Sequence, residues 1–362
     1  MSQETLPFLP PPASNRDRNL RDAYDLVGKT DWLRWTTSFR KVRTLGKGGQ
    51  GVVYLSERQG SDGFKLLVAL KVFSPENYRD DAAYREDMKA IASVAGRVAL
   101  IQHDNILDIH DFIEQRGIRI MEMEWIDGFD LNDLLSERML EASRRSLPED
   151  RWRYLNNVIL TPGPNHLRLK PGVAIQVLRE SLNGLGALHR EGIVHGDIKP
   201  SNLMIKRTGA AKIIDIGSAL CATNPGVRRM WSPTYAAPEV LAGEEATPVS
   251  DLCSLGYVLI EMLAGTNPFA RIDRYDELLT AKKSLDKRLT ELLPADVATN
   301  DMLMHLCRKM TNPDPAKRFP SAQAADLDRK GAADFHRQLV KGDLASEYET
   351  DLRTWLELVE EH

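Results

Sequence analysis

Two patterns of apolar residues divide the chain. Between residues 39 and 125 the apolar positions form short runs that are typical of β-strands, and the predicted strands are 39–46, 52–58, 66–73 and 118–125. Before the last of these, apolar residues recur at spacings of three or four, which predicts a long helix over 79–101. They are Tyr84, Met88, Ile91, Val94, Val98 and Ile101. We therefore expect a small twisted antiparallel sheet with one helix.

The chain becomes mainly helical after residue 127. Residues 173–192 carry apolar side chains on one helical face, and two short strands are predicted at 203–206 and 211–215. The longest apolar run, 252–265, is shorter than the roughly 20 residues that span a bilayer, so it predicts a buried helix. Residues 1–15 are rich in proline, and a short amphipathic segment follows at 18–27. The fold class is therefore predicted to be α+β.

Composition narrows the function classes. The 362 residues predict two lobes or domains, and the net charge of −4 with a pI of about 6.1 gives no basic field for nucleic acid or an anionic membrane. The three cysteines, Cys221, Cys253 and Cys307, form no CxxC pair, which argues against a disulfide framework or a zinc site. The N-terminus lacks the pattern of a signal peptide. We expect a cytoplasmic protein.

A glycine-rich segment lies between the first two predicted strands. It reads GKGGQG over residues 46–51, and its glycines allow backbone N–H groups to approach phosphate oxygens. A glycine-rich hairpin that binds no phosphate would have the same sequence pattern. A Rossmann site is disfavoured because a strand follows the glycines, and no P-loop motif occurs. Lys71 lies in an apolar strand, where it either reaches water or pairs with a ligand. Together the two features suggest a phosphate clamp.

A second cluster of polar residues lies in HGDIKPSN, residues 195–202. Asp197 and Asn202 are followed by Asp215 in IIDIGSA. Carboxylate and amide oxygens are hard ligands that suit Mg²⁺ bound to triphosphate oxygens. Each residue alone could be an ordinary turn residue, but their order and spacing favour a metal and phosphate site.

These motifs together resemble the protein kinase family, in particular the eukaryotic-like kinases of bacteria. VALK, HGDIKPSN and DIG are similar to the VAIK, HRDxKxxN and DFG motifs, YAAPE contains an APE motif, and SDLCSLG resembles the DxWSxG helix start. Arg318 stands where the family has the partner of the APE glutamate, Glu239. The resemblance covers about 41–330. It implies a bilobal fold with an extension over 1–40, an N-lobe over 41–126, a C-lobe over 127–332 and a tail over 333–362.

The resemblance assigns roles residue by residue. The residues implied to contact ATP are Gly46, Gly48, Gly51, Val53, Ala69, Lys71, Glu124, Ile126, Asp130 and Met204, with Met123 as gatekeeper. Asp197 would orient the substrate hydroxyl and accept its proton, and Lys199 would steady the γ-phosphate. Asn202 and Asp215 would bind Mg²⁺, and Mn²⁺ would also fit. Lys199 and Ser232 favour serine or threonine acceptors in protein substrates.

Four features depart from the family pattern. The carboxylate that pairs with Lys71 is either Glu86 or Asp87, with Glu86 preferred by residue type. An insertion at about 137–170 carries seven basic residues among acidic ones, and is either a solvated flap or a docking surface: Arg138, Arg144, Arg145, Arg151, Arg153, Arg168 and Lys170. The tail predicts one or two amphipathic helices that pack on the chain or contact a partner or second copy. Its apolar residues are Phe335, Leu339, Leu344, Tyr348, Leu352, Trp355, Leu356 and Val359.

The fourth departure is Gly196, which precedes Asp197. Many protein kinases have an arginine there that pairs with a phosphorylated activation-loop residue. Arg228 stands thirteen residues after Asp215, where many Ser/Thr kinases carry the phosphorylated threonine, and the nearby phosphosites are Ser218 and Thr223. We therefore predict activity without loop phosphorylation, with Arg228 or Arg229 ordering the loop.

Two alternative functions remain open. The glycine in HGD is also found in small-molecule kinases of the aminoglycoside or choline type, but the APE motif and Arg318 build a protein-substrate platform that those enzymes lack. An ATP-binding pseudokinase scaffold is the other alternative, although every group that handles ATP and metal is present.

Overall fold

The computed structural model describes residues 15–29, 37–216, 219–221, 232–341 and 348–358. The chain forms two compact units, one of residues up to 40 together with 57–66, the other of 41–56 together with the residues from 67 onward. The first unit contains α1 (Asn15–Lys29), which includes the predicted amphipathic segment, and the ends of the first strands, where Arg40 and Lys65 each lie 3.4 Å from Glu57. The candidate site lies within the second unit.

A five-stranded sheet follows the predicted pattern and adds one strand. Its order is β1-β2-β3-β5-β4, and β5 pairs antiparallel with both β3 and β4. The strands are β1 (Ser38–Gly48), β2 (Gly51–Gln59), β3 (Lys65–Phe73), β4 (Ile109–Gln115) and β5 (Ile118–Glu124). A short 3₁₀ turn, η1 (Ser61–Gly63), joins β2 to β3. Strand β4 was not predicted, since polar residues and a register shift after Ile109 interrupt its alternation.

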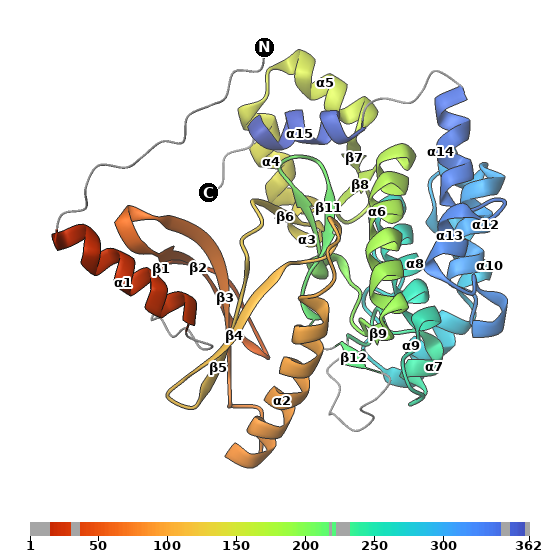
Figure 1. Cartoon of the computed structure of the whole chain (residues 1–362). Coiled ribbons are helices and arrows are strands. Elements are labelled where there is room, and N and C mark those ends of the chain that lie inside the picture. Colours follow the sequence, from red (N-terminus) through yellow and green to blue (C-terminus); the bar gives the residue numbers. More distant parts are fainter. Residues whose placement is uncertain (1–14, 30–36, 217–218, 222–231, 342–347, 359–362) are drawn as a thin grey trace, which may run out of the picture. The chain divides into compact units, whose positions relative to one another are not determined.

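The predicted long helix is α2 (Asp81–Val98), which packs beside β4 (Figure 1). The Asp80 side chain accepts a hydrogen bond from the Ala83 N–H and so begins the helix. The predicted apolar residues from Tyr84 to Val98 are buried, which confirms the helical phase.

The rest of the second unit is mainly helical, with a few short strands. Its helices are α3 (Leu131–Leu134), α4 (Glu137–Ser146), α5 (Glu149–Val158), α6 (Pro171–Arg190), α7 (Pro238–Leu241), α8 (Pro248–Ala264), α9 (Tyr275–Lys283), α10 (Leu285–Leu292), α11 (Ala295–Ala298), α12 (Asp301–Met310), α13 (Ala322–Leu327), α14 (Ala332–Lys341) and α15 (Tyr348–Leu358). Its strands and 3₁₀ turns are β6 (Gly128–Asp130), β7 (Leu160–Pro162), β8 (Leu167–Leu169), β9 (Ile193–Val194), β10 (Leu203–Lys206), β11 (Ala211–Ile213), β12 (Leu220–Cys221), η2 (Pro200–Asn202) and η4 (Pro315–Lys317).

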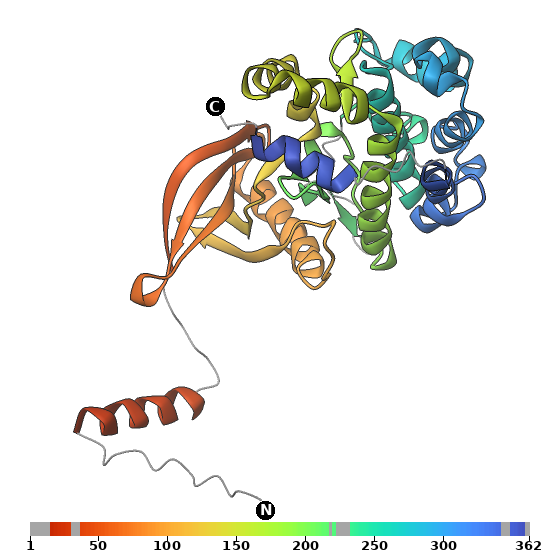
Figure 2. The same ribbon diagram turned by 90° about the horizontal axis from the view of Figure 1, so that it is seen from above.

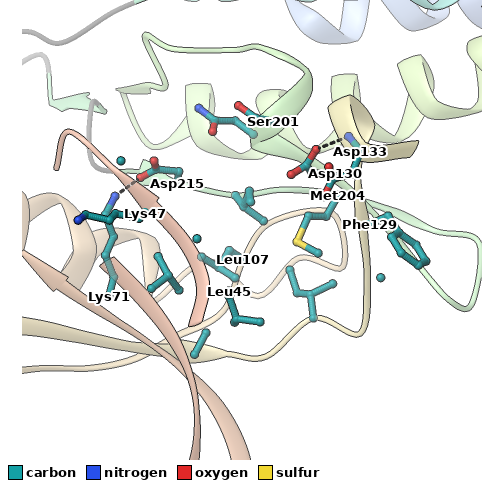
Figure 3. Close-up of a pocket in the computed structure, with 18 of the residues that line it drawn as sticks. Leu45, Lys47, Lys71, Leu107, Phe129, Asp130, Asp133, Ser201, Met204 and Asp215 are labelled. Carbon is teal, nitrogen blue, oxygen red and sulfur yellow. Dashed lines mark hydrogen bonds and ion pairs between the residues drawn. The ribbon is translucent and has the colours of Figure 1, made fainter. Parts of the chain in front are cut away.

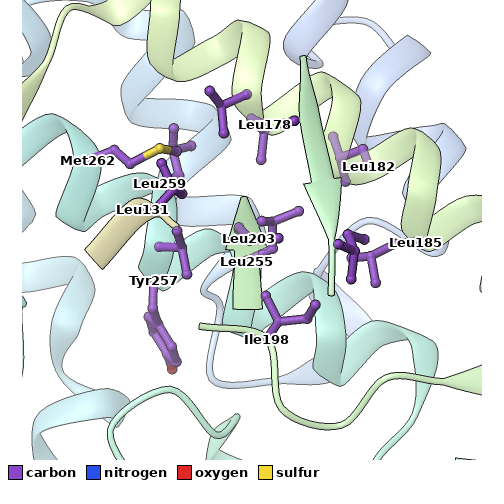
Figure 4. Packing of buried hydrophobic residues seen from close by; sticks show 14 of the residues in the cluster. Leu131, Leu178, Leu182, Leu185, Ile198, Leu203, Leu255, Tyr257, Leu259 and Met262 are labelled. Atoms are coloured by element: carbon purple, nitrogen blue, oxygen red, sulfur yellow. The ribbon is translucent and has the colours of Figure 1, made fainter. Parts of the chain in front are cut away.

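The core of this helical part forms where α6 packs on α8. Leu178, Leu182 and Leu185 of α6 belong to the same buried cluster as Leu255 and Leu259 of α8 (Figure 4), and all five are at most 2% exposed. Helix α8 is the predicted buried helix: every residue from Ser250 to Ala264 is buried. No helix among the described residues has the length and apolar character needed to span a membrane.

The insertion and the tail form ordered structure that packs together. The insertion folds into α4, α5 and the β7–β8 hairpin, and the tail forms two helices, α14 and α15. Helix α15 lies beside α4 and α6, although it is the last helix of the chain (Figure 2). Its apolar residues Tyr348, Leu352, Trp355 and Leu356 are at most 8% exposed. These side chains therefore pack within the chain, which is one of the two predicted alternatives, and a contact of the tail with a partner or second copy stays a prediction. Leu344 and Val359 lie outside the described residues.

The basic residues of the insertion largely have partners within the chain. Arg153 pairs with Glu149 at 3.1 Å, Arg168 pairs with Asp296 at 3.2 Å, and the Arg144 guanidinium lies 5.1 Å from the Trp152 ring centroid. The Arg153 pair is exposed to solvent, so the solvated flap and the docking surface for an acidic partner both stay predictions.

Candidate active site

A cavity of about 1010 Å³ is lined by every residue predicted to contact ATP. Lys71, Asp130 and Met204 of this set are labelled in Figure 3. The glycine-rich turn, β3 and the segment after β5 form part of its wall, and the loop around Asp197 forms another part. Asp197, Lys199, Asn202 and Asp215 line it as well. The fold thus brings together groups that are up to 169 residues apart in the sequence, from Gly46 to Asp215.

The glycine-rich turn between β1 and β2 depends on Gly51. Its φ is +141°, and a Cβ atom at this position would lie 2.0 Å from the carbonyl oxygen of Val72. Any side chain would therefore push the turn away from β3. The Asn77 side-chain amide donates a hydrogen bond to the carbonyl of Gly49, which holds the turn from the other side.

Lys71 is buried and contacts two groups across the cavity. Its Nζ donates to the Asp215 carboxylate at 2.5 Å (Figure 3) and to Oε1 of Gln50 at 2.6 Å. Asp215 has a φ of +61°, in the left-handed region that aspartate adopts more readily than most residues other than glycine. Gln50 was not singled out from the sequence, because its contact depends on how the turn folds over β3.

The predicted pairing of Lys71 with a carboxylate of α2 is not present in this structure. Glu86, the preferred residue, is exposed to solvent, and Asp87 accepts a hydrogen bond from the hydroxyl of Tyr78. Burial, and then the Asp87 carboxylate, raise the pKa of Tyr78, which keeps that hydroxyl a donor. Asp87 is thus held by a residue close to the start of α2, while Asp215 takes the place expected for an α2 carboxylate.

Asp197 is held on both carboxylate oxygens. Lys199 Nζ donates to Oδ2 at 2.6 Å, and the backbone N–H of Ser232 donates to Oδ1 at 3.0 Å. Lys199 also contacts the Ser232 hydroxyl at 3.1 Å, and Asn202 Nδ2 donates to the Asp197 carbonyl at 2.8 Å. Lys199 and Ser232, the two residues that favoured serine or threonine acceptors, therefore lie together and fix the orientation of the Asp197 carboxylate.

The loop that carries Asp197 is anchored by a buried carboxylate from α8. Asp251, 1% exposed, accepts the backbone N–H groups of His195 at 2.9 Å and of Gly196 at 2.8 Å. Gly196 has a φ of +77°, in the left-handed region that glycine adopts without strain. Gly196 of the HGD motif is thus the residue type that fits this backbone conformation.

The residues suggested for a metal ion fit that role by their chemistry. Asn202 and Asp215 provide amide and carboxylate oxygens on the same cavity wall. Within the described residues, no three histidine, cysteine, aspartate or glutamate side chains form a metal cluster. Two oxygen ligands suit an ion such as Mg²⁺, which is held by few protein groups and by the phosphates of its nucleotide.

A buried network connects the APE segment to the helical core. Arg318 Nη1 and Nη2 donate to the two Glu239 oxygens at 2.6 and 2.7 Å, and Ser250 donates to Glu239 at 2.9 Å. Nearby, the Tyr235 hydroxyl donates to Glu261 at 2.7 Å. The pair of Arg318 and Glu239 that the family resemblance implied is therefore present.

Lys282 of α9 supports the same segment and was not predicted. It is fully buried, its Nζ donates to the carbonyl of Thr234 at 2.6 Å, and the ring centroids of Tyr257 and Phe269 each lie 4.2 Å away. Burial lowers the pKa of Lys282 to about 7. The ring faces and the carbonyl offset part of the cost of burying its charge.

We expect this lysine to make stability depend on pH. Between pH 7 and about 10 the unfolded chain binds a proton at Lys282 that the folded chain lacks, so the free energy of unfolding should rise with pH, by at most about 1.4 kcal/mol per pH unit. Lys282→Met should remove this slope in urea titrations between pH 6.5 and 9.5. Its neighbour Lys283 is exposed, so Lys283→Met is the control. Equal slopes in all three proteins would contradict the prediction.

Helix α4 of the insertion forms an unpredicted wall of the cavity. Arg138, Met139, Ala142 and Arg145 line it beside Asp130. Asp130, the residue implied to hold the ribose, is partly buried, and this burial raises its pKa to about 6. In the sequence, the spacing of four between Met139, Ser143 and Leu147 indicates a helix with one buried face. It does not indicate that this helix lines the cavity.

Comparisons with known proteins agree with this geometry. A family model described as protein kinase domain matches residues 39–328, so the chain belongs to the protein kinase family. It is 31% identical over 289 residues to serine/threonine-protein kinase PknD of Mycobacterium tuberculosis, covering 78% of this chain and 38% of PknD. It is 26% identical over 316 residues to serine/threonine-protein kinase PrkC of Bacillus subtilis, covering 86% and 42%.

These findings confirm the resemblance to the Ser/Thr kinases of bacteria and the predicted α+β, bilobal kinase fold. The chain spans about two fifths of the length of these relatives. The boundaries predicted at 41, 127 and 333 remain predictions.

Proposed function

We propose that this chain transfers the γ-phosphate of ATP to serine and threonine hydroxyls of proteins. The observation that carries the proposal is Asp197, oriented by Lys199 and by the backbone of Ser232, in the cavity that also holds Lys71 and Asp215. The family match and the names of the relatives support it.

The residues that line the cavity would have distinct roles in phosphate transfer. Asp197 would accept a hydrogen bond from the acceptor hydroxyl and take its proton as that oxygen bonds to the γ-phosphorus. The bond from the γ-phosphorus to the bridging oxygen would break and ADP would leave, while Lys199 would offset the charge on the transferred group. Lys71 would leave Gln50 and hold phosphate oxygens. Asn202 and Asp215 would hold Mg²⁺, which supplies charge neutralisation when bound with ATP. Val53, Ala69 and Met204 would pack on the adenine ring.

The alternatives have less support. A small-molecule kinase would not require the buried network of Glu239 and Arg318 or the ordered segment around Tyr235, which fit the role of a protein-substrate platform. A pseudokinase scaffold would not require Asp197 to be held on both oxygens. The cytoplasmic location and the absence of nucleic-acid partners remain predictions.

The acceptor specificity can be tested directly. The purified chain is incubated with ATP and Mg²⁺, first with a mixture of protein acceptors and then with amino-alcohol acceptors. The protein acceptors should gain phosphoserine and phosphothreonine, because Lys199 contacts both Asp197 and Ser232 and occupies the position of a Ser/Thr kinase lysine. Mass spectrometry of the products decides this. Dominant phosphotyrosine would refute the acceptor class, whereas transfer only to amino alcohols would favour a small-molecule kinase.

We further propose that activity does not require activation-loop phosphorylation. Gly196 has no side-chain donor for a phosphate, and its N–H is donated to Asp251. Ser218, Thr223, Arg228 and Arg229 lie outside the described residues, so this part rests on the sequence. The chain co-expressed with a broad phosphatase and shown by intact mass to carry no phosphate should react in the assay above without a lag. A lag that pre-phosphorylation removes would contradict this.

A further inference from the structure

The last helix of the chain contacts two elements that line the candidate nucleotide cavity. The Trp355 indole Nε1 donates to the hydroxyl of Ser143 at 2.8 Å, and the two residues are 2% and 0% exposed. Ser143 lies on α4, and Met139, one turn earlier on the same helix, lines the cavity. Through this hydrogen bond α15 holds the helix that forms one wall of the site.

The second contact reaches the segment after β5. The Arg207 guanidinium donates to the carbonyl of Leu356 near the end of α15 and to Asp127 Oδ1 at 2.8 Å, and it lies 5.3 Å from the ring centroid of Phe129. Phe129 lines the cavity next to Asp130 (Figure 3). A cation is favoured at a helix C-terminus, where carbonyl groups lack helical partners. Arg207 thus ties the end of α15 to the segment implied to hold adenine and ribose.

Close packing leaves α15 little freedom to shift. A Cβ atom at Gly209 would lie 2.3 Å from the carbonyl oxygen of Glu349, and one at Gly172 would lie 2.1 Å from the Tyr348 hydroxyl. Tyr154 of α5 also donates to Asp351 at 2.9 Å. The contacts of α15 are therefore specific along its length.

We propose that α15 braces the nucleotide site, with Trp355 and Arg207 as positioning residues that set the affinity for ATP. Trp355 acts through Ser143 on α4, and Arg207 acts through Asp127 and Phe129. The proposal rests on the proposed function in taking this cavity as the ATP site. Neither residue touches the groups around Asp197, so the brace should affect nucleotide binding and leave the chemical step unchanged.

The test compares two buried aromatic residues of the C-terminal helices. Trp355→Phe keeps an aromatic ring but removes the Nε1 donor, so the buried Ser143 hydroxyl loses its hydrogen bond from α15. We expect the KM for ATP and the Kd for a fluorescent ATP analogue to rise roughly three- to tenfold. The kcat and the KM for the protein acceptor should stay within twofold. Phe335→Leu of α14 is the control, since Phe335 is 3% exposed in the core. It should lower Tm without changing either nucleotide constant.

Further variants make the result specific. Ser143→Ala should give a rise similar to Trp355→Phe, and the double variant should be no worse than either single variant if one hydrogen bond carries the effect. Unchanged nucleotide constants in Trp355→Phe, or an equal rise in Phe335→Leu, would overturn the brace. Because the Kd is measured without turnover, a chain that binds the analogue but phosphorylates no protein would overturn the proposed function and still test the brace.

Discussion

Asp197→Asn is expected to lower kcat for phosphotransfer by roughly 10²- to 10⁴-fold, the range for loss of a positioned general base. Asparagine preserves the shape of the side chain, and its oxygen can still accept the N–H of Ser232. In the unmutated chain the Lys199 ammonium donates to Asp197 Oδ2 at 2.6 Å. The asparagine amide, however, would turn N–H donors toward this ammonium. Both the proton acceptor and the partner of Lys199 are therefore lost, while the fold should be kept.

Initial rates with a generic protein acceptor measure this effect. The matched control is Asp286→Asn, which removes an exposed carboxylate that pairs with Arg308 at 2.7 Å and should leave kcat within twofold. Lys71→Met and Asp215→Asn should lose most activity as well, since each removes one side of the pair across the cavity. If Asp197→Asn retained more than about a tenth of the wild-type rate, the role given to Asp197 would be wrong.

Arg318→Met is expected to lower the free energy of unfolding by about 3–5 kcal/mol, the usual cost of breaking a buried ion pair from one side. Arg318 is 3% exposed and Glu239 is 9% exposed, and the two share two hydrogen bonds of 2.6 and 2.7 Å. Methionine fills part of the volume but leaves the Glu239 carboxylate buried, with Ser250 as its remaining side-chain donor in the described part of the chain. Urea denaturation at pH 7 should show the loss.

The dependence on pH gives a second measurement of the same pair. Burial alone raises the pKa of Glu239, but the hydrogen bonds and charge of Arg318 lower it on balance. A lowered carboxyl pKa contributes stability that is present above the ordinary value and lost as pH falls through the folded value. In Arg318→Met burial dominates, so the deficit should shrink as the pH falls below 7.

Two variants control for other causes. Arg308→Met breaks an exposed pair and should cost less than about 1 kcal/mol. Combining Arg318→Met with Glu239→Gln removes the uncompensated charge and should recover part of the loss. A double variant that is as unstable as the sum of the two single variants would contradict the explanation.

Much of the site could be predicted from the sequence because it consists of short, local motifs. The spacing of Asp197, Lys199 and Asn202 within one loop limits where their side chains can meet, and the structure places all three on one cavity wall. The partner of Lys71 could not be predicted in the same way. Both Glu86 and Asp87 fit one turn of α2, and whether either of them reaches Lys71 depends on how that helix packs and on the competing hydroxyl of Tyr78.

The sequence by itself determined the helical and strand periods, the glycine-rich turn and the order of the polar motifs, since these depend on interactions between residues close in the chain. Only the tertiary structure decided that Lys71 meets Gln50 and Asp215, that Lys282 is buried against Thr234, and that Trp355 holds α4 at the cavity. Each of these contacts joins residues from 21 to 212 positions apart. An apolar stripe shows that a helix will be buried, but the partner surface is selected by packing of the whole chain.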